Sequence, residues 1–586
     1  MFLILMILIS LQSTFADTDV DLPPIIKSGT PGEVLLDDPI LPALNGMTQY
    51  NSGTGTVQNS LQNQLPLSVT DYGRPGSAGQ LRGLGFSSEE LDVQAFGISL
   101  NPPQGGGFDL SAFPQFLWGG YRFQAGPALN GLNPTATSGV LSLVPWTSQA
   151  LTQAGFGARA MQFYSTTGVN QVSVSAQGDQ NLAVVAGYSG QKVRGPSFGL
   201  SSGWGKTGDR KGSEFYSGQF HLLATDLDAE APGPTYAYSP LARMRTIRVI
   251  PILQSDFRIT SSSLLKNSLF YDSSWLSYED PATFSSRSRI KQGGLSQVYL
   301  VGAWKFGSNL KWVNYQDDFQ SPPAQIFGNF QISKEMEWGS LLVQPNLQGV
   351  WVSGFGFLPQ GGLGIRKEWD HQRKALFTRW TLSHRIPSLL DWYSQDRYFQ
   401  GNRNLKEERD WTGIFGGELK SERYSGSLQL YSQLRQNARV PFNATVSNLG
   451  NAFITALITQ YQFKVSDQID LFGGETLTSS RLILAGQPFP FMPTLIHLTG
   501  VSVHSRDLAR GWNWTTNLRA FSSQLNDLST NSRLPFYSML DTSIQKRVWK
   551  EVYLTGRVEN VLDRSIELIP GYPLGRSLSF MLSGAL

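Results

Sequence analysis

The chain has 586 residues, of which only 16% are charged, against about 25% in soluble globular proteins. Its 47 basic and 44 acidic residues are scattered, and the lack of a basic stripe argues against a nucleic-acid-binding protein. Cysteine is absent, which excludes a disulfide framework, a thiolate nucleophile and a cysteine-based zinc site.

The first 16 residues predict a secretory signal peptide. A short apolar run leads to small residues, with Thr14 and Ala16 three positions and one position before the expected cleavage after Ala16. The run carries no Lys or Arg, and a buried N-terminal strand or a membrane anchor is the alternative. Residues 17–45 are rich in Asp, Pro and Leu without a sustained period, which indicates an extended segment.

Two regions of different character follow. Residues 46–148 are dense in Gly and Pro and contain short strand-like runs, among them Leu65–Thr70, Leu91–Leu100 and Gly139–Val144. In residues 149–586, segments of about 8–12 residues alternate in polarity and are separated by turn-forming residues. The sequence therefore predicts a small N-terminal domain followed by a long array of antiparallel strands.

The alternation has a period of two. In residues 171–177, Val172 and Val174 lie on one face of a strand, and Ser173 and Ser175 lie on the other. The last ten residues repeat the pattern, with Leu or Phe at positions 578, 580 and 582 and Ser at positions 577, 579 and 583. A soluble sandwich gives the same alternation, but an array of this size would need periodic blade motifs, which are not found.

A large membrane barrel fits these observations. Beyond the first dozen residues no run of about 18 apolar residues occurs, which excludes transmembrane helices. Low charge, 12% aromatic residues and many glycines are typical of a transmembrane β-barrel. With 22 strands, the number in plugged outer-membrane transporters, each strand and its connection receive about 20 residues, and a membrane-crossing strand needs about 9–11.

Three stretches carry recognisable motifs. The first lies in the N-terminal domain and comprises Pro75–Ser77, Leu81–Gly83, Leu91–Asn101, Ala125–Gly131 and Ser138–Leu143. The second comprises Arg385–Leu389 and Gly401–Glu408. The third comprises Val558–Arg564, Gly571–Pro573 and Gly575–Ser577. Each motif is weak alone, because Gly and Asn mark turns in any β protein, and only their order and spacing over residues 65–586 are specific.

In this order the motifs resemble those of the TonB-dependent outer-membrane receptors, and within them the cobalamin and siderophore transporters. The plug spacing and the C-terminal ending look most like those of the vitamin B12 receptor. The resemblance implies an all-β membrane fold, an antiparallel barrel of about 22 strands with an N-terminal plug domain in its lumen. Phe96, Ala125 and Leu586 depart from the family, which has Asp, Arg and an aromatic residue there.

The resemblance also implies a ligand site at the plug apices, which two Gly-rich turns match. Glycine lets a backbone approach a ligand closely, and Arg74, Ser77, Asn101 and Gln104 supply side-chain donors. These donors suit the amides and phosphate of a corrinoid or the oxygens of a ferric chelate. The alternative is that Gly and Pro merely form tight turns at these positions.

Coupling to a TonB-type inner-membrane protein would use an extended segment that adds as a strand to the partner's sheet edge. One candidate TonB box is Asp17, Thr18, Asp19, Val20 and Asp21, and the other is Glu33–Asp37. The expected protein is a monomer in the lipid of a Gram-negative-type outer membrane. It takes up a small-molecule ligand, cobalamin or a ferric siderophore, by energised transport. A passive porin-like channel that has lost coupling is the alternative, and a binding or adhesion barrel without transport is a third possibility.

Enzyme, cofactor and metal signals are weak. Gly199–Gly203 matches a nucleophile elbow, but that motif needs a strand-to-helix turn, and this context predicts strand and loop. The five histidines lack metal-site spacing. Asp226, Asp228 and Glu230 alternate as calcium-binding carboxylates could, or form a solvated loop. The sequence therefore predicts no enzyme, no cofactor and no metal.

Four aromatic residues lie close together in the sequence: Trp392, Tyr393, Tyr398 and Phe399. They form either an interfacial girdle or part of an extracellular loop. Their position beside the second motif favours the loop.

Overall fold

The structure is a computed structural model of the chain. It describes residues 40–585 except for the following gaps: 42–43, 47–56, 63–64, 71–79, 83, 85–87, 103–106, 111–114, 128–135, 146–155, 166–168, 179–181, 192–195, 207–215, 231–240, 261, 282–283, 320, 370–372, 395–399, 443–444, 484–485, 487, 489–491, 506–510, 526–532, 550–551 and 568–572.

The N-terminal domain is built around a five-stranded sheet in the order β1-β6-β7-β4-β5, with β4 and β7 parallel and the other pairs antiparallel. A two-stranded sheet, one short helix and two 3₁₀ turns accompany it. The elements are β1 Leu44–Gly46, α2 Val57–Gln62, β2 Ser68–Thr70, β3 Gln80–Arg82, η2 Ser88–Glu90, β4 Leu91–Ala95, β5 Ile98–Ser99, η3 Gln115–Leu117, β6 Trp118–Ala125 and β7 Gly139–Pro145.

The remaining strands form the barrel and its rim. The wall strands are β8 Phe156–Ser165, β9 Val169–Gly178, β10 Leu182–Gln191, β11 Pro196–Lys206, β12 Tyr216–Glu230, β13 Arg243–Thr260, β14 Ser263–Asp280, β15 Phe284–Val301, β16 Trp304–Asp317, β17 Gln325–Lys334, β18 Met336–Trp338, β19 Leu341–Val352, β20 Gly356–Trp369, β21 Lys374–Arg385, β22 Glu408–Lys420, β23 Tyr424–Gln436, β26 Ala452–Ser466, β27 Ile469–Leu482, β28 Leu495–His504, β29 Trp512–Phe521, β32 Tyr537–Trp549, β33 Val552–Glu559 and β36 Ser577–Ala585. The rim elements are α4 Leu389–Tyr393 and the hairpins β24 Arg439–Phe442 with β25 Thr445–Asn448, β30 Gln524–Leu525 with β31 Arg533–Leu534, and β34 Ile566–Glu567 with β35 Pro573–Leu574.

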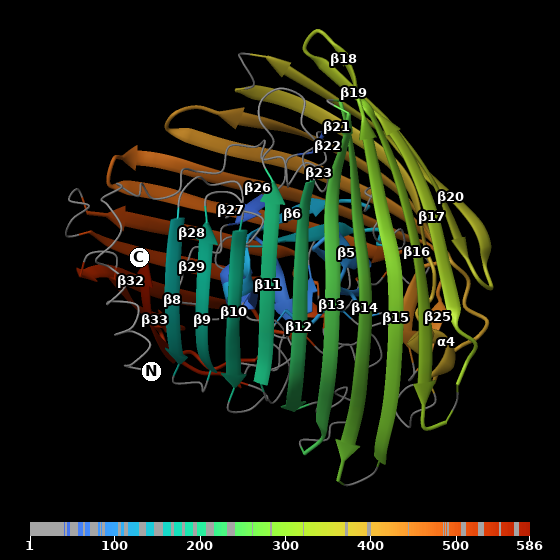
Figure 1. The fold of residues 1–586 in the computed structure, drawn as a ribbon, viewed down its shortest axis with the longest axis horizontal. Coiled ribbons are helices and arrows are strands. Elements are labelled where there is room, and N and C mark those ends of the chain that lie inside the picture. Colours follow the sequence, from blue (N-terminus) through green and yellow to red (C-terminus); the bar gives the residue numbers. More distant parts are fainter. Residues whose placement is uncertain are drawn as a thin grey trace.

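The wall closes on itself (Figure 1). Each wall strand pairs antiparallel with its neighbour in the chain, and the last strand, β36, pairs with the first, β8, from Ser579 opposite Ser165 to Ala585 opposite Arg159. Both β17 and β18 pair with β19, so these two pieces form one interrupted wall strand. The described strands therefore make a closed antiparallel barrel of 22 strands, and the predicted fold class is confirmed.

The alternation of side chains along the wall explains why the barrel suits a membrane. In β36, Leu578, Phe580 and Leu582 are 39%, 51% and 41% exposed on the outer face, whereas Ser579 and Ser583 are buried toward the lumen. Many more large apolar side chains are exposed on the other wall strands. A continuous apolar outer surface of this kind is stable only against lipid.

The two ends of the barrel differ in their connections. At one end, turns of two residues join β15 to β16, β18 to β19 and β26 to β27, and Gly302 and Gly339 adopt positive φ in the first two. At the other end the connections are longer and carry α4 and the three extra hairpins. In outer-membrane barrels short turns face the periplasm and longer loops face outward. We call the end with α4, toward the bottom of Figure 1, the outer rim.

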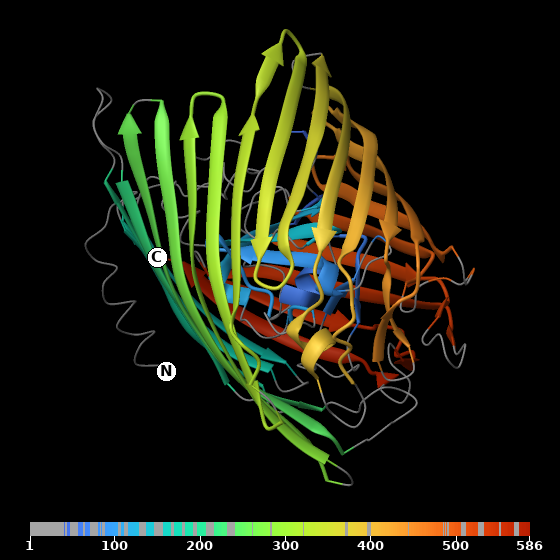
Figure 2. The ribbon, with the colours of Figure 1, turned by 90° about the vertical axis from the view of Figure 1, so that its right-hand side faces the viewer.

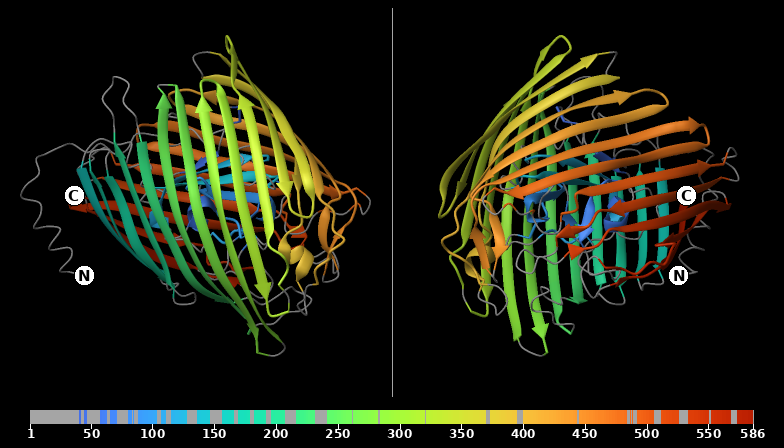
Figure 3. Two further views of the ribbon diagram at one scale, coloured as in Figure 1. Left: turned by 45° about the vertical axis from the view of Figure 1, so that its right-hand side comes forward. Right: turned by 180° about the vertical axis from the view of Figure 1, so that it is seen from behind.

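The N-terminal domain lies inside the lumen, so we call it the plug. Figure 2 and Figure 3 show its sheet enclosed by the wall from several directions. Its apolar side chains form one core cluster with inward-facing side chains of the wall, for example Phe116 and Leu117 with Val185 and Leu223. No helix in the described part of the chain is long and apolar enough to cross a membrane.

The orientation of β36 can be tested at Phe580. An arginine there would place a charge against the lipid, at a cost of about 2–4 kcal/mol if the position lies near the bilayer midplane. Phe580→Arg should therefore reduce the folded, heat-modifiable fraction recovered from outer membranes, whereas Phe580→Leu should assemble like the parent chain. Normal assembly of Phe580→Arg combined with failed assembly of Ser579→Arg would show that the register is inverted.

Candidate functional site: the interface of the plug with the barrel

The connection between β21 and β22, residues 386–407, is folded back on itself at the outer rim. Its helix α4 begins with a capping box, in which Ser388 Oγ accepts from Asp391 N at 3.1 Å and the Asp391 carboxylate accepts from Ser388 N at 2.9 Å. Gly401 lies so close to the backbone of Trp392 that a Cβ atom would approach Trp392 C to 2.6 Å. This close approach explains why the second sequence motif requires glycine here.

The neighbouring connection, which carries the hairpin β24–β25, is tied to the same segment. Asn402 Nδ2 donates to Val446 O at 3.1 Å, and Asn448 Oδ1 accepts from Lys406 N at 3.0 Å. Thr445 Oγ1 donates to Gln400 O at 2.8 Å. We call these two connections the paired loops, because their hydrogen bonds hold them together as one unit.

The aromatic residues Trp392 and Tyr393 belong to α4 in the paired loops. The ring of Trp392 stacks on Phe355, with centroids 4.8 Å apart, and the guanidinium of Arg403 lies over Tyr393. These side chains therefore lie in a rim loop, the alternative that the sequence favoured, and not in an interfacial girdle. Tyr398 and Phe399 lie outside the described residues.

Directly beneath the paired loops, a buried cluster of ion pairs joins the plug to the barrel wall. Arg435 of β23 donates through Nη2 to Glu90 Oε2 of the plug at 2.8 Å. The same guanidinium holds Asp410 of β22 at 2.9 and 3.1 Å. Ser138 Oγ of the plug also donates to Glu90 Oε2, at 2.9 Å. The side chains of Glu90, Arg435 and Asp410 are all almost fully buried.

A second arginine extends the cluster. Arg385, the last residue of β21, contacts Glu89 at 2.8 Å, Glu90 at 3.4 Å and Glu408 at 2.9 Å. Since Glu89 and Glu90 belong to the plug and Glu408 begins β22, Arg385 bridges plug and wall. We call Glu89, Glu90, Arg385, Glu408, Asp410 and Arg435 the plug lock.

The plug lock is connected to the paired loops through Arg439 of β24. Its Nε donates to Glu408 Oε2 at 3.0 Å and its Nη1 donates to Asp391 Oδ2 of α4 at 2.6 Å. The backbone N–H of Arg439 donates to Glu408 Oε1 at 2.7 Å. A continuous chain of charged contacts therefore runs from α4 at the outer rim to the plug.

The environment of Glu90 keeps this carboxylate ionised. Burial would raise its pKa, but the positive charges of Arg435 and Arg385, together with hydrogen bonds from Arg435 and Ser138, outweigh burial and lower the pKa to about 2. Removing one partner of such a buried pair leaves an uncompensated charge. The plug lock therefore resists any change that displaces Glu90 while the arginines stay in the wall.

Elsewhere the wall holds the plug through backbone oxygens. Arg248 of β13 donates to Leu100 O at 2.9 Å while it is ion-paired with Asp272 of β14 at 2.8 Å. Arg366 of β20 donates to Ile40 O at 3.3 Å. Thr476 of β27 donates to Pro66 O at 2.7 Å. The plug is thus attached on several sides of the lumen.

Two of the positions at which the sequence departs from the resembled motifs lie where the plug meets the wall. Phe96 has φ 54° and lies on the ring of His221, with centroids 3.8 Å apart. Gly97 follows at φ 70°, and a Cβ there would collide with the side chain of Ser268. Ala125, the second of these positions, is buried and precedes Gly126, whose backbone packs against Ile414 of β22. Apolar packing and close backbone approach thus seat the plug at these departures.

The structure brings together the Ser and a His of the nucleophile-elbow match without forming a hydrolase site. Ser201 lies on β11, and its Oγ is 2.6 Å from His221 Nδ1. The other ring nitrogen of His221 lies 3.0 Å from Gln254 Oε1, so the described third partner is an amide and not a carboxylate. The ring of Phe96 lies against His221, and both Ser201 and His221 are fully buried.

Eight uncharged polar side chains lie on the lumen face of β17 to β23, beside charged ones such as Arg366 and Arg379. Cross-strand neighbours form two runs, Gln331 with Gln348 and Gln360, and Thr381 with Thr412 and Gln433. The other two are Asn346, which Gly362 separates from Thr381, and Ser383, two residues from Thr381 on the same face of β21. We call these eight residues the amide belt. All are buried, and within the described residues the side-chain amides of Gln348 and Gln433 form no hydrogen bond. Buried amides of this kind usually bind water.

Of the four predicted ligand residues, the structure describes only Asn101. Its Oδ1 accepts from Val93 N at 2.8 Å and its Nδ2 donates to Leu91 O at 2.6 Å, so its amide pins the loop after β5 to β4. Arg74, Ser77 and Gln104 lie outside the described residues, as do the signal peptide, both candidate TonB boxes and Leu586. The ligand role of this group stays a prediction.

The plug lock was not predicted from the sequence. Arg385 and Glu408 were noticed only as parts of a motif, and Glu90 is 345 residues from its partner Arg435. The one available signal was the acidic pair Glu89 and Glu90 directly before a predicted buried strand.

As for metals, the described residues contain no group of three or more His, Asp or Glu side chains arranged to hold an ion. Asp226 and Asp228 lie on β12 and pair with Arg245 and Arg243.

Comparison with known proteins identifies the fold. No protein-family model and no curated protein sequence matches the chain. Among solved structures, the copper transporter OprC has a TM-score of 0.74 at 13% identity and covers 93% of this chain and 100% of its own. The siderophore receptor PiuA from Acinetobacter baumannii has a TM-score of 0.75 at 13% identity, with 96% and 99% covered. The ferric citrate transporter FecA has a TM-score of 0.73 at 14% identity, with 95% and 98% covered.

The chain therefore has the plugged-barrel fold of the TonB-dependent outer-membrane receptors, over nearly its whole length. At 13–14% identity the likeness is one of fold. The resemblance drawn from the sequence motifs is confirmed at this level. The finer resemblance to the vitamin B12 receptor gains no support from these structures, which are receptors and transporters for metals and siderophores.

The role of the plug lock can be tested with Glu90→Gln, which keeps the shape of the side chain and removes its charge. We expect the free energy of plug opening to fall by about 3 kcal/mol. Amide hydrogen exchange in β4 and β7 should then accelerate on the order of 100-fold. The matched control is Glu89→Gln, whose side chain is 33% exposed and whose loss should cost less than about 1 kcal/mol. Equal acceleration in both variants would count against a special role for Glu90.

The lowered pKa of Glu90 also sets a pH dependence. A carboxylate whose pKa falls on folding, here from 4.5 to about 2, stabilises the docked plug fully above pH 4.5. This stabilisation should be lost as the pH falls from 4.5 to about 2. Calorimetry of the plug transition in detergent should show this acid loss in the parent chain and a shallower one in Glu90→Gln. Identical slopes in the two proteins would contradict it.

Proposed function

We propose that this protein is a TonB-dependent outer-membrane receptor that imports a scarce, polar small-molecule ligand, a ferric chelate or a related metal complex, by energised transport. The protein is not an enzyme in this proposal and carries no resident cofactor. Its partners are the lipid of a Gram-negative outer membrane, its ligand and a TonB-type protein of the inner membrane, and it acts as a monomer.

The observation that carries the proposal is the plug lock. Buried ion pairs hold the plug in the lumen, and this favours energised transport over a passive channel. Diffusion alone does not supply the energy to separate charges such as Glu90 and Arg435. An external pull on the plug does supply it. The contacts from Arg439 to Glu408 and Asp391 favour a receptor in which the paired loops and the plug respond together to a ligand.

The ligand class is favoured by two observations. The amide belt offers uncharged donors and acceptors along the wall that the plug covers, which suits an oxygen-rich ligand that exchanges hydrogen bonds as it passes. The structurally similar proteins include a copper transporter, a siderophore receptor and a ferric citrate transporter. Cobalamin, which the motifs favoured slightly, is kept as the competing ligand. Arg74, Ser77, Asn101 and Gln104 are the proposed plug-apex donors.

The division of the chain follows from this function. We assign residues 1–16 to the signal peptide, 17–45 to an extended periplasmic segment, 46–148 to the plug and 149–586 to the barrel. The last residues of the extended segment already belong to the plug in the structure, because Ile40 contacts Arg366 of the wall and the plug sheet starts at Leu44. Within that segment, Asp17–Asp21 is the first candidate for the TonB box and Glu33–Asp37 is the second.

Uptake by intact cells tests the proposal. Cells that lack the protein, with and without a complementing copy, are given labelled ferric chelates, copper or cobalamin in separate arms. We expect complementation to restore uptake of a ferric chelate or copper, and a protonophore to abolish the restored uptake. Deletion of residues 17–21 should also abolish the restored uptake. Deletion of residues 33–37 tests the second candidate TonB box in the same way.

The other outcomes are equally informative. Restored uptake that survives the protonophore would support the passive channel and refute energised import. Restored uptake of cobalamin alone would keep the transport mechanism and replace the ligand class. No restored uptake in any arm, with the barrel correctly assembled, would refute the import function proposed here.

A further inference from the structure

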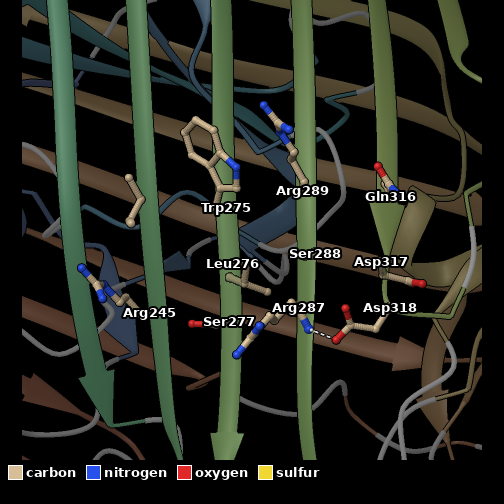
Figure 4. Close-up of a pocket in the computed structure, with 11 residues that line it drawn as sticks. Arg245, Trp275, Leu276, Ser277, Arg287, Ser288, Arg289, Gln316, Asp317 and Asp318 are labelled. Atoms are coloured by element: carbon tan, nitrogen blue, oxygen red, sulfur yellow. Dashed lines mark hydrogen bonds between the residues drawn. The ribbon is translucent and has the colours of Figure 1, made fainter.

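The outer surface of the barrel carries a pocket of about 290 Å³ near the outer rim, on strands β13 to β16. Figure 4 shows Trp275, Arg289 and Gln316 side by side on neighbouring strands, with Arg245, Arg287 and Asp318 on the next level toward the rim. The pocket lies outside the lumen, away from the plug, and plays no part in the transport path proposed above.

Strand register shows that the pocket faces the membrane side. Leu253, Leu269, Leu295 and Leu310 are direct neighbours across β13 to β16, and all four are strongly exposed on the outer face. Residues separated by an even number of positions point to the same side of a strand. On β15, Arg287, Arg289 and Lys291 are separated from Leu295 by even numbers, so they share its outward face.

The depth of these cations follows from the same register. Next to the leucine row, the rings of Tyr271 and Trp312, with centroids 6.2 Å apart, flank Gly293. Two further tryptophans lie at equal distances on either side of the leucine row. Trp275 pairs with Arg289, six residues from Leu295 toward the rim, and Trp304 pairs with Val301, six residues toward the short turns. Aromatic girdles mark the two edges of the apolar band, so the leucine row lies at its middle. Arg289 is six residues from Leu295, which is about 20 Å along the strand and roughly 15 Å along the membrane normal at the usual tilt. That is about half the thickness of a hydrocarbon core, so Arg289 lies at the level of the lipid headgroups.

The charges at this level are unequally paired. Arg245 is held by Asp226 at 2.7 Å and Arg243 by Asp228 at 2.9 Å, so these two arginines are neutralised on the protein. The guanidinium of Arg289 instead stacks over the ring of Trp275 at 5.1 Å, which leaves its N–H edges free to bond another group.

The remaining cations are not neutralised in the described part of the chain, where the side chains of Arg287, Arg289 and Lys291 form no ion pair. Two carboxylates also line the pocket, and both are bonded elsewhere. Asp318 accepts the backbone N–H of Arg287 at 2.9 Å, and Asp317 accepts from Tyr315 Oη and Phe319 N, each at 2.8 Å. A row of three cations at the aromatic edge of the apolar band attracts anionic headgroups, and arginine binds phosphate through two parallel hydrogen bonds.

We propose that Arg287, Arg289 and Lys291 form a binding site for the phosphate of an outer-leaflet lipid, a phosphorylated glycolipid of the lipopolysaccharide type. The acyl chains lie against the leucine row and the rings of Tyr271 and Trp312, and the phosphate enters the pocket beside Trp275. The site rests on the placement of the barrel in an outer membrane and does not depend on what the receptor imports.

The test measures lipid binding by the purified full chain in detergent, by native mass spectrometry. The probes are lipid A, dephosphorylated lipid A and inorganic phosphate. We expect the parent chain to prefer lipid A over the dephosphorylated form. The triple variant Arg287→Gln, Arg289→Gln, Lys291→Gln should bind lipid A about 100-fold more weakly, since each basic residue at a membrane surface contributes roughly fivefold.

The matched control removes outward cations from the opposite rim. Lys367 of β20 and Lys546 of β32 are exposed near the short-turn end, and Lys367→Gln with Lys546→Gln should leave lipid A binding unchanged. Heat-modifiable migration of every variant confirms that its barrel is folded.

Three results would overturn the site. One is unchanged lipid A binding in the triple variant, and another is equal binding of lipid A and its dephosphorylated form. The third is displacement of lipid A by inorganic phosphate at similar concentrations, which would show a phosphate site without a lipid. Because binding is measured on purified protein, these results are independent of the uptake experiment.

Discussion

Glu90 lies between two guanidinium groups in a space from which water is almost excluded, and much of the structure serves to keep it there. Arg435 is contributed by β23 and Arg385 by β21, and these arginines also pair with Asp410 and Glu408, respectively, of the strand between them. Desolvating so many charges is unfavourable unless each finds a partner. The register of three wall strands and the placement of η2 in the plug therefore depend on one another.

The same reasoning relates the outer rim to the lumen. The paired loops are ordered by contacts such as the capping box at Ser388 and the close approach at Gly401, before any ligand is considered. Arg439 then transmits the position of α4 to Glu408. By contrast, the amide belt beside the plug lock is uncharged, so the strongest attachment of the plug is concentrated in a small part of the wall.

The sequence predicted the barrel well and its interior poorly, for a physical reason. Alternation in residues 171–177 and 577–583 is a local consequence of one face meeting lipid, so it is visible in any short window, and the exposures of Phe580 and Ser579 agree with it. Pairing between Glu90 and Arg435 is set by the closure of the whole barrel, which no local pattern encodes. Asn101 shows what a local pattern leaves out. A polar side chain beside glycines predicts a ligand donor, and the structure adds that both ends of its amide are bonded to the backbone of β4.

Three of the contacts that seat the plug end on main-chain oxygens, those of Ile40, Pro66 and Leu100. Any amino acid supplies such an oxygen, so a substitution at these positions leaves the acceptor in place as long as the backbone keeps its course. The wall, in contrast, must keep Arg248, Arg366 and Thr476 as donors. In evolutionary terms the plug is the freer partner, because its side chains at these three positions can change while the wall keeps its donors.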